Sequence, residues 1–547
     1  MDTSDDNSNA GGGTPPGQPA RTPAFLAVAA VLVAYAWFGS GGTFEFRRVS
    51  WERSHDSGFT ERYYAALAEG FLRGQLDMPY PRDARWDQVA NAYDIKDRER
   101  LGMAWEMWDA TLYGGKFYLY FSPVPVLLFY IPFRLLSGGY PADTLAATFF
   151  CAWAFLACVG FARRALDGRL RALWVLLIGF ANVVPFTLTN VRTYEVAVAA
   201  GMAFTATFAY ALLRFTETRA TKHAVWMSVW LALAIATRPN LAVLLLIAGL
   251  VLWRHWRAAL FAMIPLAVVG TAYSVYNIAR FGNPFELGIT YQISYVPMWR
   301  VGVCSLCSAP DVVRLVNNVT HYVFWPPTFM GAFPYVDLQR NVFDPAVSFA
   351  GGAEQILGIA AISPLVLIGT AIALVRRNER APQLVMAAAW LILFGLSTCR
   401  WVVARYSLDF MLLMTTATVV LLDRALHETR TRAATIAVAI VACFSIVTGI
   451  LAGFRGPEGV FLRKLDATAA RDRHPLHRDA PAATACRDGT PARSARRGCG
   501  GARVFRATRP TRRCTRSPAA APGARATRRS PRPPDRYATA ARGGRRS

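Results

Sequence analysis

The run Ala24-Phe-Leu-Ala-Val-Ala-Ala-Val-Leu-Val-Ala-Tyr-Ala-Trp-Phe38 has no charged residue and is the first of many similar apolar runs. A helix of about 20 apolar residues crosses a hydrocarbon layer of about 30 Å. The repeated runs predict an all-α, polytopic integral membrane protein with roughly ten to twelve transmembrane helices. After the first run, the expected spans are residues 142–162, 172–189, 194–215, 224–236, 241–252, 260–278, 356–375, 384–396, 408–422 and 434–454.

The overall composition excludes a soluble protein. Hydrophobic residues make up 54% of the 547 residues, and the mean hydropathy is positive. A soluble multidomain chain would expose too many apolar runs to water.

The net charge of +25 is concentrated near the C-terminus. Residues 471–547 contain 21 arginines, four aspartates and no lysine, so they contribute +17 and leave +8 for the remainder. The basic pI of 10.2 therefore does not indicate a nucleic-acid-binding protein. Residues 455–547, rich in Arg, Ala and Pro, are expected to be a disordered tail because they contain few aliphatic residues. A basic interaction arm and an out-of-frame reading of a GC-rich gene both explain this composition.

The rest of the chain divides into a short leader and one membrane domain. We expect residues 1–23 to be a disordered leader before an uncleaved first helix, because the chain starts with a polar, Gly-rich and acidic stretch before Arg21, unlike a cleaved signal peptide. Residues 24–454 form the predicted transmembrane domain. Its two large polar segments are 42–122 and 280–355.

The distribution of basic residues predicts which side the loop 42–122 occupies. Cytoplasmic connections of membrane proteins are enriched in Lys and Arg. When the loop is placed outside, every inner connection is basic, so we expect the loop to be extracytoplasmic. The expected localisation is the cell membrane, with several crossings, as in a bacterial inner membrane. The inner residues are Arg163, Arg164, Arg169, Arg171, Arg219, Lys222, Arg254, Arg257, Arg376, Arg377, Arg380, Arg424, Arg430 and Arg432.

The distribution of basic residues also predicts whether the apolar segment 121–136 crosses the membrane. If it were a span, every later loop would change sides and Arg163 and Arg164 would lie outside. We therefore expect an interfacial or partly re-entrant helix, with Pro123 and Pro125 tolerated in its first turn.

An apolar stripe precedes this segment in the first loop. Phe59, Tyr63, Leu67 and Phe71 recur every four residues, which predicts one apolar helix face. We expect this helix to lie on the membrane surface and to hold Glu61 at the lipid–water boundary.

Three carboxylates of the first loop are candidate catalytic groups. Asp56, Glu61 and Asp109 could accept a proton from a hydroxyl or bind a hard cation, although a loop carboxylate is often simply solvated. Asp109 is the strongest candidate because it lies between Trp108 and the aromatic run 113–121.

Four arginines at outer helix ends depart from the charge rule. Guanidinium groups bind phosphate bidentately, whereas snorkelling at the interface is the structural alternative. The phosphate-binding candidates are Arg192, Arg238, Arg400 and Arg405, with Lys116 of the first loop. Further substrate-binding candidates are Tyr113, Tyr118, Glu195 and Asp409.

Metal and nucleotide motifs are weak or missing in the sequence. Cys304 and Cys307 fit a disulfide or, with less support, half of a metal site. His55 and His321 are not spaced as the ligands of a metal site are, so the sequence predicts no ligand set. A divalent cation is still compatible with the sequence. No Walker loop, dinucleotide-binding glycine pattern or H-E-x-x-H motif occurs in a usable context.

The layout resembles the GT-C superfamily of membrane glycosyltransferases, which includes protein O-mannosyltransferases and aminoarabinose transferases. The resemblance is carried by Thr60-Glu61-Arg-Tyr-Tyr-Ala-Ala-Leu-Ala-Glu-Gly-Phe-Leu-Arg-Gly and Gly115-Lys-Phe-Tyr-Leu-Tyr-Phe-Ser-Pro-Val-Pro after a first span. In that family an acidic pair opens the loop helix, but Thr60 replaces the first acid here. The match is closest to a poorly characterised bacterial branch.

The resemblance implies a polyprenyl-phosphate sugar as donor and a glycan, lipid or protein as acceptor. A carboxylate would deprotonate the acceptor hydroxyl, and arginine would stabilise the leaving phosphate. Two alternatives stay open: a transporter or flippase for lipid-linked glycans, and a non-catalytic protein that binds glycan or lipid. Thr60 leaves the non-catalytic alternative open, whereas charges at the outer helix ends instead of the membrane midplane favour an enzyme over a transporter.

Overall fold

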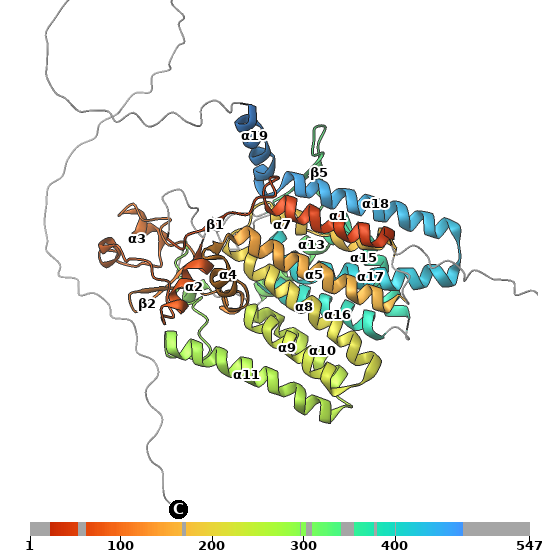
Figure 1. The fold of residues 1–547 in the computed structure, drawn as a ribbon, viewed down its shortest axis with the longest axis horizontal. Helices are drawn as coiled ribbons and strands as arrows, with labels where there is room; N and C mark the ends of the chain where they lie inside the picture. Colours follow the sequence, from red (N-terminus) through yellow and green to blue (C-terminus); the bar gives the residue numbers. More distant parts are fainter. Residues whose placement is uncertain are drawn as a thin grey trace, which may run out of the picture. The chain divides into compact units, whose positions relative to one another are not determined.

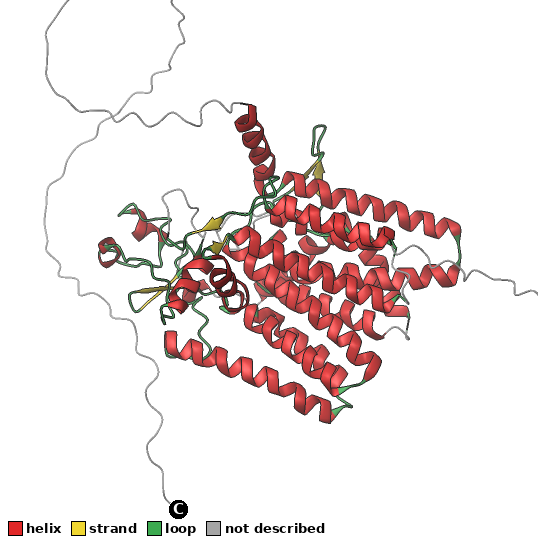
Figure 2. Ribbon diagram, in the orientation of Figure 1, coloured by secondary structure: helices red, strands yellow, loops and turns green. Residues whose placement is uncertain are grey.

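The computed structural model describes residues 22–52, 62–166, 171–295, 297–301, 309–340, 355–376, 380–399 and 401–473. These residues are mostly helical (Figure 2), which confirms the all-α, polytopic membrane architecture. Six helices in the described ranges are long and apolar enough to cross a membrane. They are α5 (Asp143–Ala165), α8 (Thr193–Thr218), α11 (Trp256–Phe281), α16 (Arg380–Ser397), α17 (Leu408–Thr429) and α18 (Arg432–Arg455).

The helical domain also contains shorter helices. The apolar ones are α1 (Thr22–Gly39), α10 (Leu244–Leu252), which follows the 3-10 turn η3 (Pro239–Val243), and α15 (Leu365–Val375). The others are α6 (Ala172–Phe180), α7 (Val184–Leu188), α9 (Thr221–Thr237), α12 (Met298–Val301), α13 (Ala309–Phe324), α14 (Ile359–Ile362) and the 3-10 turn η4 (Ala404–Ser407).

The elements of the first loop gather at one end of the long helices (Figure 1). In chain order they are β1 (Arg48–Val49), α2 (Tyr63–Leu72), η1 (Ala84–Asp87), α3 (Ile95–Glu99), β2 (Thr111–Tyr113), β3 (Lys116–Tyr118), η2 (Val126–Tyr130), α4 (Ile131–Ser137) and β4 (Tyr140–Pro141). Strand β1 pairs with β4 and β2 with β3, both antiparallel. A third antiparallel pair, β5 (Pro327–Phe329) with β6 (Val336–Leu338), lies in the second large segment.

The apolar segment before α5 is short. The π-helical turn η2 and α4 together span Val126–Ser137, or 12 residues. At 1.5 Å per residue this length is about 18 Å, which is less than the hydrocarbon thickness. A full span over 121–136 is therefore not formed, in agreement with the prediction.

The helix predicted for the membrane surface is buried in protein. Seven of the ten residues of α2 are buried, among them Tyr64 and Leu67. The ring of Tyr64 stacks on that of Tyr130 at 5.4 Å between centroids. The prediction of a surface helix was wrong, because Tyr63 and Leu67 of the apolar stripe are buried inside the protein instead of facing lipid.

One expected span is broken near its middle. Residues 172–189 form α6 and α7, separated by residues 181–183. The side chain of Asn182 donates to the carbonyl of Ile178 at 2.8 Å, and its oxygen accepts from the Val184 amide at 2.8 Å. The side chain thus pairs backbone groups at the break, which is necessary where no water is available. The expected span 356–375 is likewise divided into α14 and α15 at Pro364.

Helix α18 approaches this break closely. A Cβ atom added at Gly449 would lie 1.7 Å from the carbonyl oxygen of Phe180, so only glycine fits there. On the other side, the Tyr35 hydroxyl of α1 donates to the Gly179 carbonyl at 2.6 Å. The broken helix is therefore held between α1 and α18.

The predicted boundary of the disordered tail at residue 455 was wrong. The described chain continues through the turn η5 (Pro457–Gly459) into α19 (Val460–Arg473). Phe461 is fully buried, with its ring 5.1 Å from Trp37 and 5.3 Å from Phe38. One buried aromatic anchors a helix that the composition alone did not predict. The expected leader, apart from residues 22 and 23, and residues 474–547 lie outside the described residues.

We expect Gly449→Ala to destabilise the protein by about 1–3 kcal/mol, because the methyl group forces α18 away from the α6–α7 break. Gly249→Ala in α10 is the matched control, since nothing lies within 4 Å of its added Cβ. Alanine should be neutral or favourable at that position. Thermal unfolding of purified protein measures both variants, and equal midpoints would contradict the packing described here.

Candidate functional site

A cavity of about 810 Å³ opens where the first loop meets the helix ends. This volume lies in the range of small-molecule sites, about 300–1,000 Å³. Its charged lining comes from parts of the chain that are distant in sequence. These residues are Asp109, Arg192, Glu195, Arg238, Arg340, Arg405 and Glu458.

The backbone around Asp109 is fixed by the second large segment. The Asp109 amide donates to the Ile293 carbonyl at 2.9 Å, and the Ile293 amide donates to Ala110 at 2.8 Å. The Leu112 amide continues the pattern to the Tyr291 carbonyl at 3.0 Å. Asp109 has a φ of 60°, which aspartate tolerates better than most residues. The pairing aims its side chain into the cavity.

Two side chains bind the carboxylate of Asp109. The Gln292 amide donates to Oδ1 at 2.5 Å. The Tyr194 hydroxyl, from the first turn of α8, donates to Oδ2. The carboxylate is buried and held in one orientation by a loop residue and a helix residue.

Glu195 connects two of the arginines at the start of α8. Its Oε2 accepts a hydrogen bond from the Arg192 backbone amide at 2.8 Å, as an acid at the third helix position often does. Its Oε1 lies 3.9 Å from Nε of Arg405, which is too long for a hydrogen bond. The Arg405 guanidinium also lies over the Tyr194 ring, 4.9 Å from the centroid.

Arg238 and Asp409 form a buried ion pair beside the cavity. Nε and Nη2 of Arg238 lie 2.9 Å and 2.8 Å from Oδ2 of Asp409. The guanidinium lines the cavity, whereas Asp409 lies behind it and accepts a further bond from Asn240 at 3.3 Å. Arg238 thus has a structural role in this ion pair and also faces the cavity.

Two of the four arginines that line the cavity belong to close ion pairs. Arg238 is neutralised by Asp409, and Arg340 on the rim pairs with Glu458 at 3.1 Å. Within the described residues, Arg192 has no carboxylate oxygen within the 4 Å of an ion pair, and Nε of Arg405 lies 3.9 Å from Oε1 of Glu195. Arg192 and Arg405 both line the cavity, where a guanidinium group can bind a phosphate.

Aromatic rings cover much of the remaining wall. Trp105, Trp108 and Tyr295 form one cluster, with centroids 4.6–5.9 Å apart. Tyr120 lies against Phe121 at 4.0 Å. Burial, with a smaller contribution from the charge of Asp109, raises the pKa of Tyr120 well above its usual range, so this hydroxyl stays protonated. Such walls offer flat apolar faces and a few hydrogen-bond donors.

Besides Asp409, three described residues of the predicted site do not line this cavity. Lys116 pairs with Asp77 at 3.1 Å on the loop surface. Tyr113 and Tyr118 pack on Phe281 at the end of α11, with centroids 5.5 Å and 5.4 Å apart. Their side chains join the β2–β3 hairpin to α11.

Other predicted residues lie outside the described residues. They are Asp56, Glu61 and Arg400, together with Thr60, His55, Cys304 and Cys307. His321 is described and lies on α13, where its Nδ1 is 2.7 Å from the Asn317 carbonyl. Among the described residues, no group of three or more His, Cys, Asp and Glu is arranged to hold a metal ion.

Three residues of the site region were not predicted from the sequence: Gln292, Tyr194 and Arg98. Tyr194 stands between two selected residues in Val191-Arg-Thr-Tyr-Glu195, so its neighbours could have drawn attention to it. Gln292 has no local signal, because it reaches Asp109 only through long-range strand pairing.

Arg98 holds together the two chain segments that position Asp109. It is fully buried and donates to the carbonyls of Ala92 and Ser294, both at 2.8 Å, and Ala104 at 3.2 Å. Its guanidinium lies 5.8 Å from the Trp108 ring centroid. Burial, partly offset by Asp94 and other acids, lowers the pKa of Arg98 to about 10, so it remains charged at neutral pH. This one side chain joins the first loop to the second segment.

The fold and cavity define a polytopic helical membrane protein with a polar, aromatic-lined site at one end of its helices. No family model matches the chain, and no curated protein matches it significantly.

We expect Arg98→Met to lower the free energy of unfolding by about 3 kcal/mol and to expose the first loop to proteases. Each buried carbonyl left without a donor costs about 1–3 kcal/mol. Arg100→Met is the control, because Arg100 is 74% exposed and pairs with Asp97 at the surface. Limited proteolysis and thermal unfolding test this role, which would be refuted by loop cleavage at the same rate in both variants.

Proposed function

We propose that the protein is a membrane glycosyltransferase that moves a sugar from a polyprenyl-phosphate donor to an acceptor hydroxyl. One observation carries the proposal: a buried carboxylate, Asp109, lines the same cavity as Arg192 and Arg405. A group that accepts a proton and groups that bind a phosphate are the two requirements of this reaction. The resemblance of the first loop to the GT-C superfamily is consistent with it.

The proposed reaction is a displacement at the anomeric carbon of the sugar. The acceptor oxygen forms a bond to that carbon while Asp109 takes its proton. The bond from the carbon to the phosphate oxygen breaks, and the polyprenyl phosphate leaves with the electron pair. Arg192 and Arg405 stabilise the developing negative charge on the phosphate.

Neighbouring side chains position these groups. Gln292 and Tyr194 hold the Asp109 carboxylate in one orientation. The face of Tyr194 also supports Arg405, so one tyrosine contacts both the proposed base and a proposed phosphate ligand. The cluster of Trp105, Trp108 and Tyr295 offers ring faces for the apolar side of a sugar. Glu61 and Asp56, the other two predicted carboxylates, lie outside the described residues.

Two features support an extracytoplasmic site. The basic connections lie at the helix ends opposite the first loop, as the positive-inside rule requires of the cytoplasmic side. Cys399, which lines the cavity, is disulfide-bonded. Structural disulfides form and persist in oxidising compartments such as the periplasm. A bacterial inner membrane with its first loop outside satisfies both.

A transporter of lipid-linked glycans is the second candidate. Transporters build their sites at discontinuous helices, and the α6–α7 break is one such feature. Phe186 and Thr187 of α7 reach the cavity, but Asn182 at the break does not line it. The charged groups of the cavity lie at helix ends, which favours the transferase.

We expect Asp109→Asn to lower kcat for sugar transfer by a factor of about 100 or more, because the amide cannot accept the hydroxyl proton. The assay uses membranes that contain the full chain, a radiolabelled polyprenyl-phosphate sugar and envelope acceptors. Asp77→Asn is the matched control, since Asp77 belongs to the same loop but pairs with Lys116 away from the cavity. Equal transfer by all three proteins would exclude Asp109 as the base. If wild type moves the labelled lipid between leaflets without forming product, the transporter is correct.

We expect Arg192→Gln and Arg405→Gln to weaken donor use, with kcat/KM about 10-fold lower for each. A hydrogen bond to a charged group is worth about 1.5–3 kcal/mol. Arg82→Gln is the control because Arg82 pairs with Asp87 on the loop surface. The phosphate assignment fails if donor kcat/KM is unchanged in both cavity variants.

A further inference from the structure

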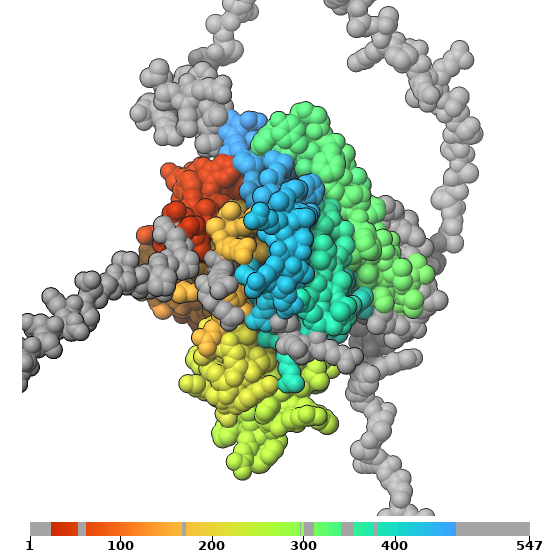
Figure 3. All heavy atoms as spheres, turned by 90° about the vertical axis from the view of Figure 1, so that its right-hand side faces the viewer, coloured from red at the N-terminus to blue at the C-terminus, as the bar shows by residue number. Residues whose placement is uncertain are grey.

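A second cavity, of about 480 Å³, lies at the connection between α17 and α18. This connection is at the end of the helices opposite the first loop (Figure 1). The lining residues are Leu426, His427, Arg430, Arg432, Thr435 and Ile436. Figure 3 turns this end of the helices toward the viewer, with α18 in blue.

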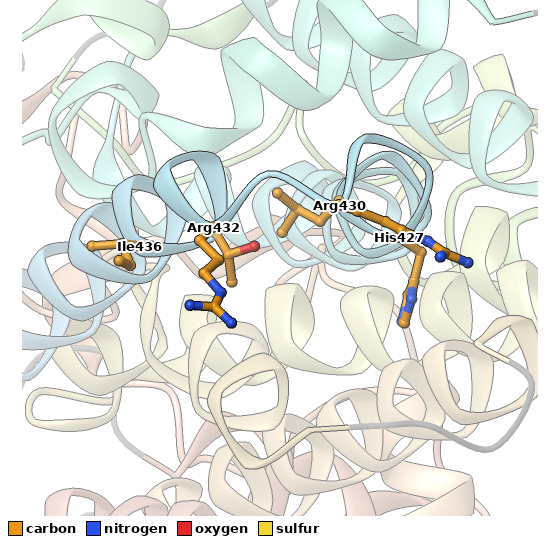
Figure 4. A pocket seen from close by; sticks show the side chains of 6 residues that line it. His427, Arg430, Arg432 and Ile436 are labelled. Atoms are coloured by element: carbon orange, nitrogen blue, oxygen red, sulfur yellow. The ribbon is translucent and has the colours of Figure 1, made fainter.

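The polar side of this cavity is cationic. Arg432 and His427 extend to the same side of the connection (Figure 4). Neither Arg430 nor Arg432 has a carboxylate oxygen within the 4 Å of an ion pair among the described residues. The nearest acid in sequence, Glu428, is bound by Arg376 through two hydrogen bonds of 2.8 Å and 2.7 Å. The two guanidinium groups therefore keep their hydrogen-bonding capacity for an anion.

The other acid near the cavity is also engaged. Asp423 is buried, and its Oδ1 accepts a hydrogen bond from Nε1 of Trp174 at 2.7 Å. Its Oδ2 lies 3.8 Å from Nε2 of His427, and Oδ1 lies 3.7 Å from Nε of Arg171. The Asp423 charge is thus directed to α6 and His427, away from Arg430 and Arg432.

The remaining side of the cavity is apolar and continues along α18. Ile436 lines it and is 59% exposed, and Ile440, one turn further, is 64% exposed. Exposed isoleucines on a membrane-spanning helix face the lipid chains. A ligand bound here would place an anionic group at the arginines and an apolar chain along Ile436 and Ile440.

We propose that the α17–α18 cavity binds the phosphate headgroup of an anionic phospholipid. Arg430 and Arg432 bind the phosphate oxygens, and Thr435 offers a hydroxyl. Leu426 and Ile436 contact the first carbons of an acyl chain. Basic pockets between helices on the cytoplasmic side commonly bind such headgroups. This inference does not depend on the glycosyltransferase proposal, because the two cavities lie at opposite helix ends.

The test uses the purified full chain in a non-ionic detergent, titrated with fluorescent phosphatidylglycerol. We expect Arg430→Gln/Arg432→Gln to weaken binding about 10-fold or more. The matched control is Arg254→Gln/Arg257→Gln, which removes the same charge from the α10–α11 connection at the same end of the helices. We expect this control to bind within twofold of wild type.

Two competitors identify the source of the anion. Unlabelled phosphatidylglycerol should displace the probe, whereas phosphatidylcholine and inorganic phosphate should not. Displacement by inorganic phosphate at a similar concentration would overturn the lipid assignment in favour of a small-anion site. If both double variants weakened lipid binding equally, the loss of affinity would reflect net charge alone. That result would also overturn the lipid site.

A second variant separates binding from folding. Arg430→Lys/Arg432→Lys keeps both charges but loses bidentate contact. We expect intermediate affinity and a wild-type elution volume in size-exclusion chromatography. Wild-type affinity in a well-folded glutamine variant would refute the site.

Discussion

The buried ion pair between Arg238 and Asp409 determines how three long helices meet at the outer cavity. Arg238 follows α9, and Asp409 opens α17. A Cβ atom at Gly201 of α8 would lie 2.7 Å from Cδ of Arg238, so a glycine makes room for this side chain. Breaking a buried pair leaves an uncompensated charge and costs about 3–5 kcal/mol. The positions of α8, α9 and α17, and with them the arginines and Tyr194, depend on this contact.

The same physical requirement, that buried polar groups find partners, explains the broken helix. Backbone groups in hydrocarbon have no water to bind, so a break is tolerated only where side chains or neighbouring helices pair them. Asn182 supplies those bonds, and the glycine at 449 lets α18 cover the break. The break in this helix is therefore tolerated because its backbone groups are paired and covered.

Asp109 is held in position by contacts with residues that lie about 180 positions later in the sequence. Its amide pairs with Ile293, its carboxylate accepts from Gln292, and Arg98 joins the same two segments from behind. These contacts make the first loop and the second large segment one structural unit. The cavity is consequently a product of both segments and of the helix ends, and none of these parts forms it alone.

The sequence by itself determined the membrane class, the helical architecture and the arginines and acids at helix ends, because apolar length and charge are local properties of the chain. It also indicated that 121–136 is not a full span. The tertiary structure alone decided that α2 is buried, that 172–189 is broken and that α19 continues past residue 455. It also brought Asp109, Arg192, Arg238 and Arg405 to one cavity, separated Lys116 from them, and added Gln292 and Arg98. These outcomes depend on pairing between distant residues, which local periodicity and composition do not encode.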